Sequence, residues 1–151
     1  YYIKHRLLSV ERCVEIATEY AKEREQFGRQ IGSFQAVQHH CANMLIDVEG
    51  SKYITYKTAW MLDQKYQHGT FSALECSKYL SMCKYLAPHH ALDTFRRVMY
   101  WFGAYGYTKE CPLEMGMRGV MSYCIGAEGA QNIQKIVIAR ETLGRDWTHT
   151  R

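Results

Sequence analysis

The chain has 151 residues, 47% of them hydrophobic, and a formal net charge of +4, which argues against disorder and fits one domain with a real core. Its basic residues form no stripe with interleaved aromatics, which argues against a nucleic-acid partner, and no stretch approaches the ~18 uninterrupted apolar residues of a membrane span. Six cysteines without a C-x-x-C pair favour free, buried thiols in a reducing compartment over a zinc site.

Only two prolines interrupt the chain, and this scarcity of helix breakers favours long helices over many short strands. The first apolar face recurs at steps of three and four residues, which predicts a helix. This helix is expected to end near Phe27 and Gly28, with Gly28 available for a left-handed cap. The face comprises Leu7, Val10, Val14, Ala17 and Ala21.

A second helix is expected to follow, with Ser33 as its N-cap. Its apolar spacing continues until the sequence QHGT stops it. Thr70 or Ser72 then begins a third helix, whose apolar face continues past Pro88. Because the periodicity resumes beyond it, Pro88 predicts a kink rather than a break.

The stretch FGAYGYTKECP contains two glycines and a proline, and it predicts a loop. A short helix is expected around residues 113–124 and a last helix from near Glu128, while the tail RDWTHTR is expected to fray. No strand signal of any length is present. The elements therefore predict an all-α fold in a single domain over residues 1–151, an antiparallel four-helix bundle of long helices with a short extra helix.

Two pairs of adjacent histidines, His39–His40 and His89–His90, suggest metal ligands. Neighbours on a helix point about 100° apart, so each pair offers only one ligand to a given site. The sequence also lacks the Glu-x-x-His motif of di-metal sites in bundles. We therefore expect no metal site, and histidines that lie on the surface or in a groove.

Two stretches specify more residue types than a helix joint requires: REQFGRQIGSFQ at 24–35 and IGAEGAQNIQ at 125–134. In the second, Glu128 stands among small apolar residues just before the last helix. Two interpretations of Glu128 stay open. It caps the helix, where negative charge is favourable, or it is a general base that a substrate can approach closely because its neighbours are small.

In their order along the chain, these motifs resemble the C-terminal α-helical domain of the acyl-CoA dehydrogenase family. The stretch YAKEREQFGRQIGSFQAVQ is similar to the family pattern Y-A-x-x-R-x-Q-F-G-x-x-I-x-x-F-Q-x-x-Q. FGAYGYTKECPLEMGMRG is similar to G-G-x-G-Y-x-x-E-x-P-x-E-x-x-x-R-D, and EGAQNIQ to E-G-T-x-Q-I-Q. KIVIAR resembles the helix that closes the domain, so the resemblance covers roughly residues 7–140.

The resemblance implies an FAD-dependent enzyme that oxidises an acyl-CoA thioester to a 2-enoyl-CoA and passes electrons to an electron-transfer flavoprotein. Family members are usually tetramers, so we expect a homo-oligomer, either a dimer or a tetramer. The partial aromatic stripe of residues 53–66 is typical of packing, here against a second subunit.

Family members also carry an N-terminal helical domain and a middle β-domain, which this sequence does not contain. The chain begins at Tyr1 without an initiator methionine, which suggests a piece of a longer protein. We therefore expect the chain to be inactive by itself. Its expected location is the cytoplasm, or the mitochondrial matrix if the source is eukaryotic.

The resemblance also assigns roles to individual residues. It implies that Glu128 takes the α-proton of the substrate; in some relatives the base lies instead near the start of the domain's first helix. It further implies that Arg24 reaches the pyrophosphate of an FAD held mainly by a neighbouring subunit, and a guanidinium fork suits a diphosphate. The other residues implied to bind the cofactor are Gln26, Phe27, Gln35, Tyr100, Gly103, Ala104, Ala130 and Asn132.

Several positions depart from the family patterns. Tyr100 stands where relatives carry a flavin-binding glutamine, and the second glycine, the Asp, the Thr and a Gln of the motifs are replaced by Ala104, Gly119, Ala130 and Asn132. Each lost polar side chain removes a potential hydrogen bond, commonly worth about 0.5–1.5 kcal/mol net. The departures leave an alternative, a divergent or non-catalytic member of the family whose helical domain serves mainly in oligomer assembly.

Overall fold

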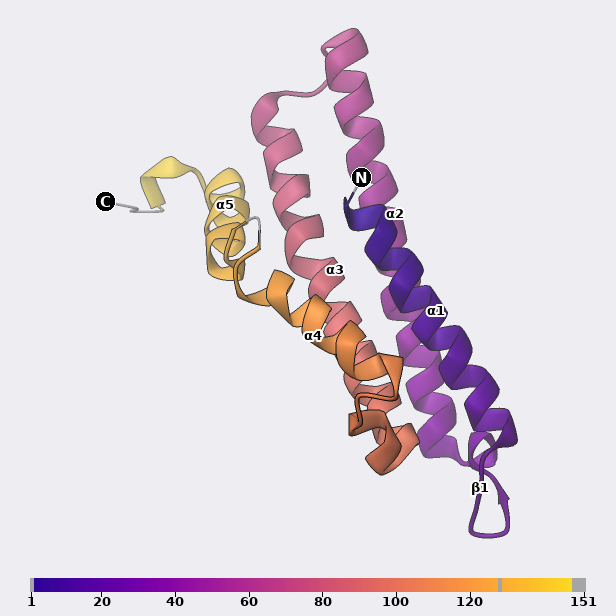
Figure 1. Cartoon of the computed structure of the whole chain (residues 1–151). Coiled ribbons are helices and arrows are strands. Elements are labelled where there is room, and N and C mark those ends of the chain that lie inside the picture. The colour runs from indigo at the N-terminus through magenta and orange to yellow at the C-terminus, as the bar shows by residue number, and fades with distance from the viewer. Residues whose placement is uncertain (1, 128, 148–151) are drawn as a thin grey trace.

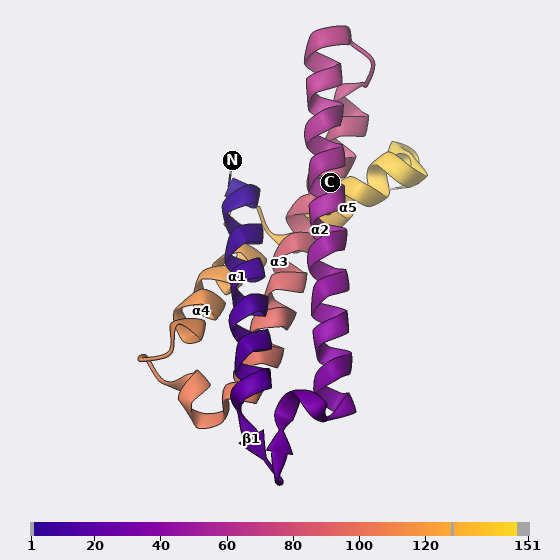
Figure 2. The same ribbon diagram turned by 90° about the vertical axis from the view of Figure 1, so that its right-hand side faces the viewer.

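The computed structural model describes residues 2–127 and 129–147, with side chains from residue 10 onward. Within this part, α3 is central and contacts each of the other helices (Figures 1 and 2). The all-α prediction is confirmed, with three long helices rather than four, and none of the described helices is long and apolar enough to cross a membrane. The helices are α1 (Tyr2–Glu23), α2 (Gln35–His68), α3 (Ala73–Phe102), α4 (Pro112–Ile125) and α5 (Gln131–Leu143).

The clearest departure from the predicted fold lies between α1 and α2, where the chain forms a small hairpin. Strand β1 (Glu25–Gln26) pairs antiparallel with β2 (Arg29–Gln30). The tip residues Phe27 and Gly28 have φ values of 55° and 78°, as a two-residue hairpin turn requires. The predictions that α1 ends near Phe27 and that the chain has no strand are therefore wrong. Gly28 does adopt a left-handed backbone, but in a hairpin tip rather than a helix cap.

The two predicted N-caps have opposite outcomes. The Ser33 hydroxyl donates to the carbonyl of Gln30 at 2.7 Å, within a 3₁₀ turn, η1 (Ile31–Ser33), so it does not cap α2. Ser72 is confirmed as the N-cap of α3. Its hydroxyl accepts from the backbone N–H of Glu75 at 3.2 Å, and the Glu75 carboxylate accepts from the Ser72 N–H at 2.9 Å.

The second half of the chain follows the prediction with small shifts. Helix α3 runs unbroken through Pro88, which confirms the predicted continuity, while the kink stays a prediction. The predicted loop contains a 3₁₀ turn, η2 (Gly103–Tyr107). Helix α5 begins at Gln131 rather than near Glu128, which itself lies outside the described residues. Part of the tail forms another 3₁₀ turn, η3 (Arg145–Trp147).

The core lies where α1, α2 and α3 meet the beginning of α4. The six cysteines are free, and Cys13, Cys76, Cys83 and Cys111 are buried, which confirms the predicted buried thiols at these four positions. Burial raises the pKa of Cys13 to about 12, so that thiol is protonated at neutral pH. The main cluster contains Val10, Cys13, Ala17, Met44, Val48, Ala91, Phe95, Val98, Cys111, Leu113 and Val120.

A close contact seats α4 on α3. At Gly116, an added Cβ would lie 2.5 Å from Cε1 and 2.7 Å from Cζ of Phe95. The Phe95 ring belongs to the main core and is 4% exposed, so position 116 has no room for a side chain. This contact lets α4 pack closely on α3 at this point.

Candidate cofactor site at the hairpin end

The hairpin presents three of the predicted cofactor residues at one end of the bundle (Figures 1 and 2). Phe27 at the tip is 91% exposed, and Arg24 and Gln26 are exposed beside it. Within the described part of the chain, the guanidinium of Arg24 makes no ion pair or hydrogen bond. The hairpin therefore offers an aromatic ring and a cation to solvent.

Contacts around the hairpin fix its shape although its tip is exposed. The backbone N–H of Ile31 donates to the carbonyl of Arg24 at 2.8 Å and closes the hairpin. The Arg29 guanidinium lies 4.1 Å from the centroid of the Phe34 ring, and Phe27 meets the same ring edge-on at 6.1 Å between centroids. A left-handed backbone at Phe27 costs about 1–2 kcal/mol, so these contacts hold the Phe27 backbone in an unfavourable conformation.

Gln35, another predicted cofactor residue, is the first residue of α2 and is exposed just beyond the hairpin. One turn further, Gln38 donates from Nε2 to the carbonyl of Gly32 at 3.1 Å. Gly32 has no room for a side chain, because a Cβ there would lie 2.9 Å from the carbonyl oxygen of Ala21. These contacts join the end of α1, the hairpin and the start of α2 into one unit.

The C-terminal end of α3 brings a second group of predicted residues to the same end of the bundle. Tyr20 of α1 stacks on Phe102 of α3 with ring centroids 4.0 Å apart, which ties the two helix ends together. Tyr100 is 72% exposed, and Gly103 and Ala104 begin η2 at the surface. Gly103 has a φ of 60° and open space on its side-chain side, so a ligand can approach its backbone.

The third predicted group, at the start of α5, lies apart from the first two. In both views α5 begins well away from the hairpin along the length of the bundle (Figures 1 and 2). Ala130 is the N-cap residue of α5 and supplies no side-chain cap, and Asn132 is exposed. The predicted base, Glu128, lies outside the described residues. One bundle therefore does not bring all the predicted cofactor residues together.

Sequence reasoning missed two amide side chains near the start of α5. The Nε2 atom of Gln131 is buried and has no hydrogen-bond partner among the described residues. The side-chain nitrogen of Gln134 lies 2.8 Å from the place where a Cβ on Gly129 would be. A buried donor without an acceptor costs about 1–3 kcal/mol, so an acceptor beyond the described residues is expected here. No sequence signal marked these two glutamines, because amides are ordinary on helices.

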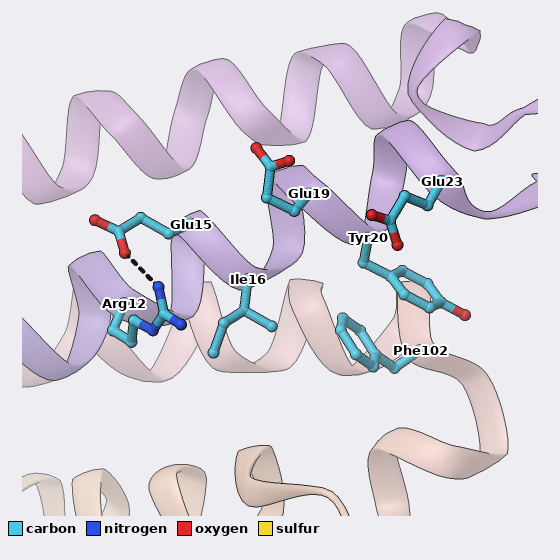
Figure 3. Close-up of a pocket in the computed structure, with 7 residues that line it drawn as sticks. All are labelled: Arg12, Glu15, Ile16, Glu19, Tyr20, Glu23 and Phe102. Carbon is cyan, nitrogen blue, oxygen red and sulfur yellow. Dashed lines mark hydrogen bonds and ion pairs between the residues drawn. The ribbon is translucent and has the colours of Figure 1, made fainter.

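Beside the Tyr20–Phe102 stack, α1 and α3 form an open cleft of about 300 Å³ (Figure 3). Arg12 already pairs with Glu15 at 2.9 Å, which leaves the cleft with an excess of carboxylates. Carboxylates repel a diphosphate, so the cleft is not the place for the charged part of a nucleotide. Its lining residues are Arg12, Glu15, Ile16, Glu19, Tyr20, Glu23 and Phe102.

A polar network between α2 and α3 includes one of the predicted groove histidines. Nδ1 of His90 lies 2.9 Å from both the Ser51 hydroxyl and the Asp47 carbonyl, and because a carbonyl only accepts, Nδ1 carries a proton. Ser51 is 1% exposed and donates its hydroxyl to the same carbonyl, so it is not an accessible nucleophile. No group of three or more His, Cys, Asp or Glu side chains among the described residues is placed to hold a metal.

Comparison with known proteins decides the family. Residues 5–143 match the family described as acyl-CoA dehydrogenase, C-terminal domain. The chain belongs to the acyl-CoA dehydrogenase family.

The matches span nearly all of this chain but only part of each relative. The glutaryl-CoA dehydrogenase of Desulfococcus multivorans is 34% identical over 134 residues, which are 89% of this chain and 32% of that protein. The mitochondrial short/branched chain specific acyl-CoA dehydrogenase of Bos taurus is 34% identical over 128 residues, 85% of this chain and 28% of that protein.

Solved structures agree with the sequence relatives. Butyryl-CoA dehydrogenase from Megasphaera elsdenii has a TM-score of 0.79 at 28% identity over 93% of this chain and 34% of its own. The FAD complex of PigA has a TM-score of 0.81 at 27% identity over 93% and 34%. This chain therefore spans about a third of the length of the relatives it matches.

The acyl-CoA dehydrogenase family is FAD-dependent, and the hairpin end of this bundle fits that cofactor. The unpaired Arg24 guanidinium suits a diphosphate, the exposed rings of Phe27 and Tyr100 suit contact with a planar ring, and Gly103 leaves its backbone open. The hairpin projects from the bundle (Figure 1), and the rings of Phe27 and Tyr100 are 91% and 72% exposed.

Proposed function

We propose that this chain is the C-terminal domain of an FAD-dependent dehydrogenase that converts an acyl-CoA thioester to the 2-enoyl-CoA. The observation that carries the proposal is the projecting hairpin, with Arg24 unpaired and Phe27 exposed, on a chain whose family match covers residues 5–143. The names of its relatives, among them a glutaryl-CoA and a butyryl-CoA dehydrogenase, support the reaction type.

The cofactor-binding roles divide between two parts of the bundle. At the hairpin end, the proposed diphosphate contact is Arg24. The start of α5 carries the other proposed cofactor residues, Ala130 and Asn132. Because the two parts lie at different levels of one bundle, we propose that they contact different copies of FAD in an oligomer. The other residues proposed for the hairpin end are Gln26, Phe27, Gln35, Tyr100, Gly103 and Ala104.

Glu128 is the proposed general base. Its neighbours Ala127 and Gly129 are small, which favours close approach of the thioester α-carbon. The carboxylate takes the proton from the α-carbon while hydride leaves the β-carbon. The electron pair of the broken α-carbon C–H bond forms the new double bond between the two carbons. Bound FAD supplies the hydride acceptor.

The proposed partners are further copies of the chain and an electron-transfer flavoprotein. The rings of Tyr53, Tyr56, Trp60 and Tyr66 on α2 are 53–79% exposed and suit a subunit contact in a dimer or tetramer. Sedimentation that shows only monomer at high micromolar concentration would contradict this. A chain solved in work on the electron transferring flavoprotein of Acidaminococcus fermentans matches at 33% identity and supports the acceptor. The proposed location is the cytoplasm, or the mitochondrial matrix in a eukaryote.

The test is stopped-flow reduction of the flavin in the full-length protein by a panel of acyl-CoAs. Glu128→Gln should bind flavin normally, yet lose about 10²–10⁴ of the reduction rate, because an amide cannot take the α-proton. Glu19→Gln, an exposed carboxylate paired with Lys22, is the matched control and should reduce at the wild-type rate. A wild-type rate in Glu128→Gln would place the base elsewhere, and a colourless protein without response would favour the non-catalytic alternative.

A further inference from the structure

A lysine and a tyrosine meet across α2 and α3, toward the end of the bundle opposite the hairpin. Nζ of Lys57 donates a hydrogen bond to the phenol oxygen of Tyr79 at 2.9 Å. The same nitrogen lies 4.3 Å from the centroid of the Tyr79 ring. One ammonium group therefore touches both the hydroxyl and the face of one phenol.

This geometry favours the ionised phenol. A cation that donates to the phenol oxygen stabilises the phenolate more than the neutral phenol. The Lys57 hydrogen bond accordingly lowers the pKa of Tyr79, the charges of Lys57 and Lys78 add to the effect, and slight burial opposes it. Since Tyr79 is also partly exposed, small reagents can reach it.

Other tyrosines of the same two helices lack this arrangement. Tyr53 and Tyr56 are 72% and 62% exposed and contact no cation among the described residues. Tyr66 has the ammonium of Lys65 5.1 Å from its ring centroid, but its oxygen receives no hydrogen bond from any residue that the structure describes. The chain therefore supplies internal controls for exposure alone and for a cation near the ring alone.

We propose that Tyr79 and Lys57 form a reactive pair, in which the Tyr79 phenolate is the preferred nucleophile of these helices toward sulfonyl and activated acyl groups. With a sulfonyl fluoride, the phenol oxygen forms the new S–O bond, the S–F bond breaks and fluoride leaves, while the phenol proton passes to the buffer. The proposal does not depend on the flavin or on the dehydrogenase reaction.

The experiment treats the purified full chain with benzenesulfonyl fluoride near pH 8, at a dilution where sedimentation shows a monomer, so that the proposed subunit contact does not cover Tyr53, Tyr56 and Tyr66. Labelling at each tyrosine is measured by peptide mass spectrometry at low conversion. Tyr79 should be labelled before Tyr53, Tyr56 and Tyr66. Lys57→Met, which keeps the length of the side chain, should slow Tyr79 labelling about two- to fivefold, the range expected for an exposed charge pair. Lys57→Arg should keep most of the rate.

Both comparisons are needed for the proposal to stand. The comparison within the wild-type protein does not depend on how a variant folds, and circular dichroism checks the folding of Lys57→Met. Labelling of Tyr79 no faster than Tyr53, an unchanged Tyr79 rate in Lys57→Met, or a sulfonyl group on the Lys57 amine instead of the phenol would each overturn the proposal.

Discussion

Replacing Gly116 with alanine tests how α4 is seated on α3. The new Cβ would lie 2.5 Å from Cε1 of Phe95, whereas ordinary van der Waals contact begins at 3.4 Å. The Phe95 ring is 4% exposed and cannot turn into solvent. Because the interior is close-packed, either this ring or α4 itself must move by about 1 Å.

Two opposing effects set the size of the change. Alanine is favoured over glycine inside a helix by about 1 kcal/mol, while overpacking a core costs about 1–3 kcal/mol. Gly116→Ala should therefore lower the free energy of unfolding by about 0–2 kcal/mol. The matched control is Gly119→Ala in the same helix, where a Cβ would meet nothing within 4 Å. That control should raise the free energy of unfolding by up to about 1 kcal/mol.

Urea unfolding followed by circular dichroism measures the difference between these two variants, which should be about 1–3 kcal/mol. In a Phe95→Leu background the shorter side chain relieves the contact, so Gly116→Ala should lose most of its cost there. Equal urea midpoints for Gly116→Ala and Gly119→Ala would refute the reasoning. They would show that α4 shifts freely on α3, and that the close packing of Gly116 on Phe95 does not fix its position.

Three further predictions concern single positions. Arg24→Ala should weaken flavin binding by the full-length protein about 10–100-fold, as for loss of a charged hydrogen bond, and a flavin-fluorescence titration with unchanged affinity would exclude Arg24 from the site. Hydrogen bonds from Ser72 hold the pKa of Glu75 below its usual 4.5, so their stabilisation is present at neutral pH and is lost as the pH falls below that value. Ser72→Ala should accordingly lower the melting temperature more at neutral pH than at pH 3, where the hydroxyl still accepts from the Glu75 N–H but no longer donates to a carboxylate. Burial raises the pKa of Cys13 to about 12, so Ellman's reagent near pH 8 should label Cys13 only after unfolding, and labelling of the native protein would contradict its burial.

The helices could be predicted from the sequence because their signals are local and long. The apolar spacing that includes Val10 and Ala17 marks a buried face whatever the rest of the chain does. Ser72 and Glu75 carry a capping signature within four residues. Pro88 could be read as internal to α3 because periodicity continued on both sides of it.

The hairpin could not be predicted in this way. Its strands are two residues long, and an alternating pattern is recognisable only over about four to eight residues. Its tip is Phe27–Gly28, whereas the usual signal for such a turn is Asn-Gly or Asp-Gly. A phenylalanine with a left-handed backbone is uncommon, so residue type gave no warning of it.

The candidate site was likewise predictable from the sequence only in part. The resemblance to the family motifs supplied the identities of Arg24, Tyr100 and Ala130. The spacing of apolar residues, however, specifies which face of a helix a residue occupies, and not how far along the assembled bundle that residue lies. The separation of the α5 start from the hairpin end therefore emerged only from the structure. The buried amide of Gln131 was equally invisible, because its lack of a partner depends on packing between helices distant in sequence.

The conformation of Phe27 links the fold to the proposed cofactor. An isolated chain gains little from a ring that is 91% exposed on a left-handed backbone, since the strain is present while the apolar surface stays in water. Arg24 beside it is likewise unpaired within the described chain. Both features become favourable once a flavin nucleotide or a neighbouring subunit covers the hairpin. Binding must then stabilise the fold, by about 2.7 kcal/mol at a ligand concentration of 100 Kd, so cofactor loss and loosening of this end of the bundle should occur together.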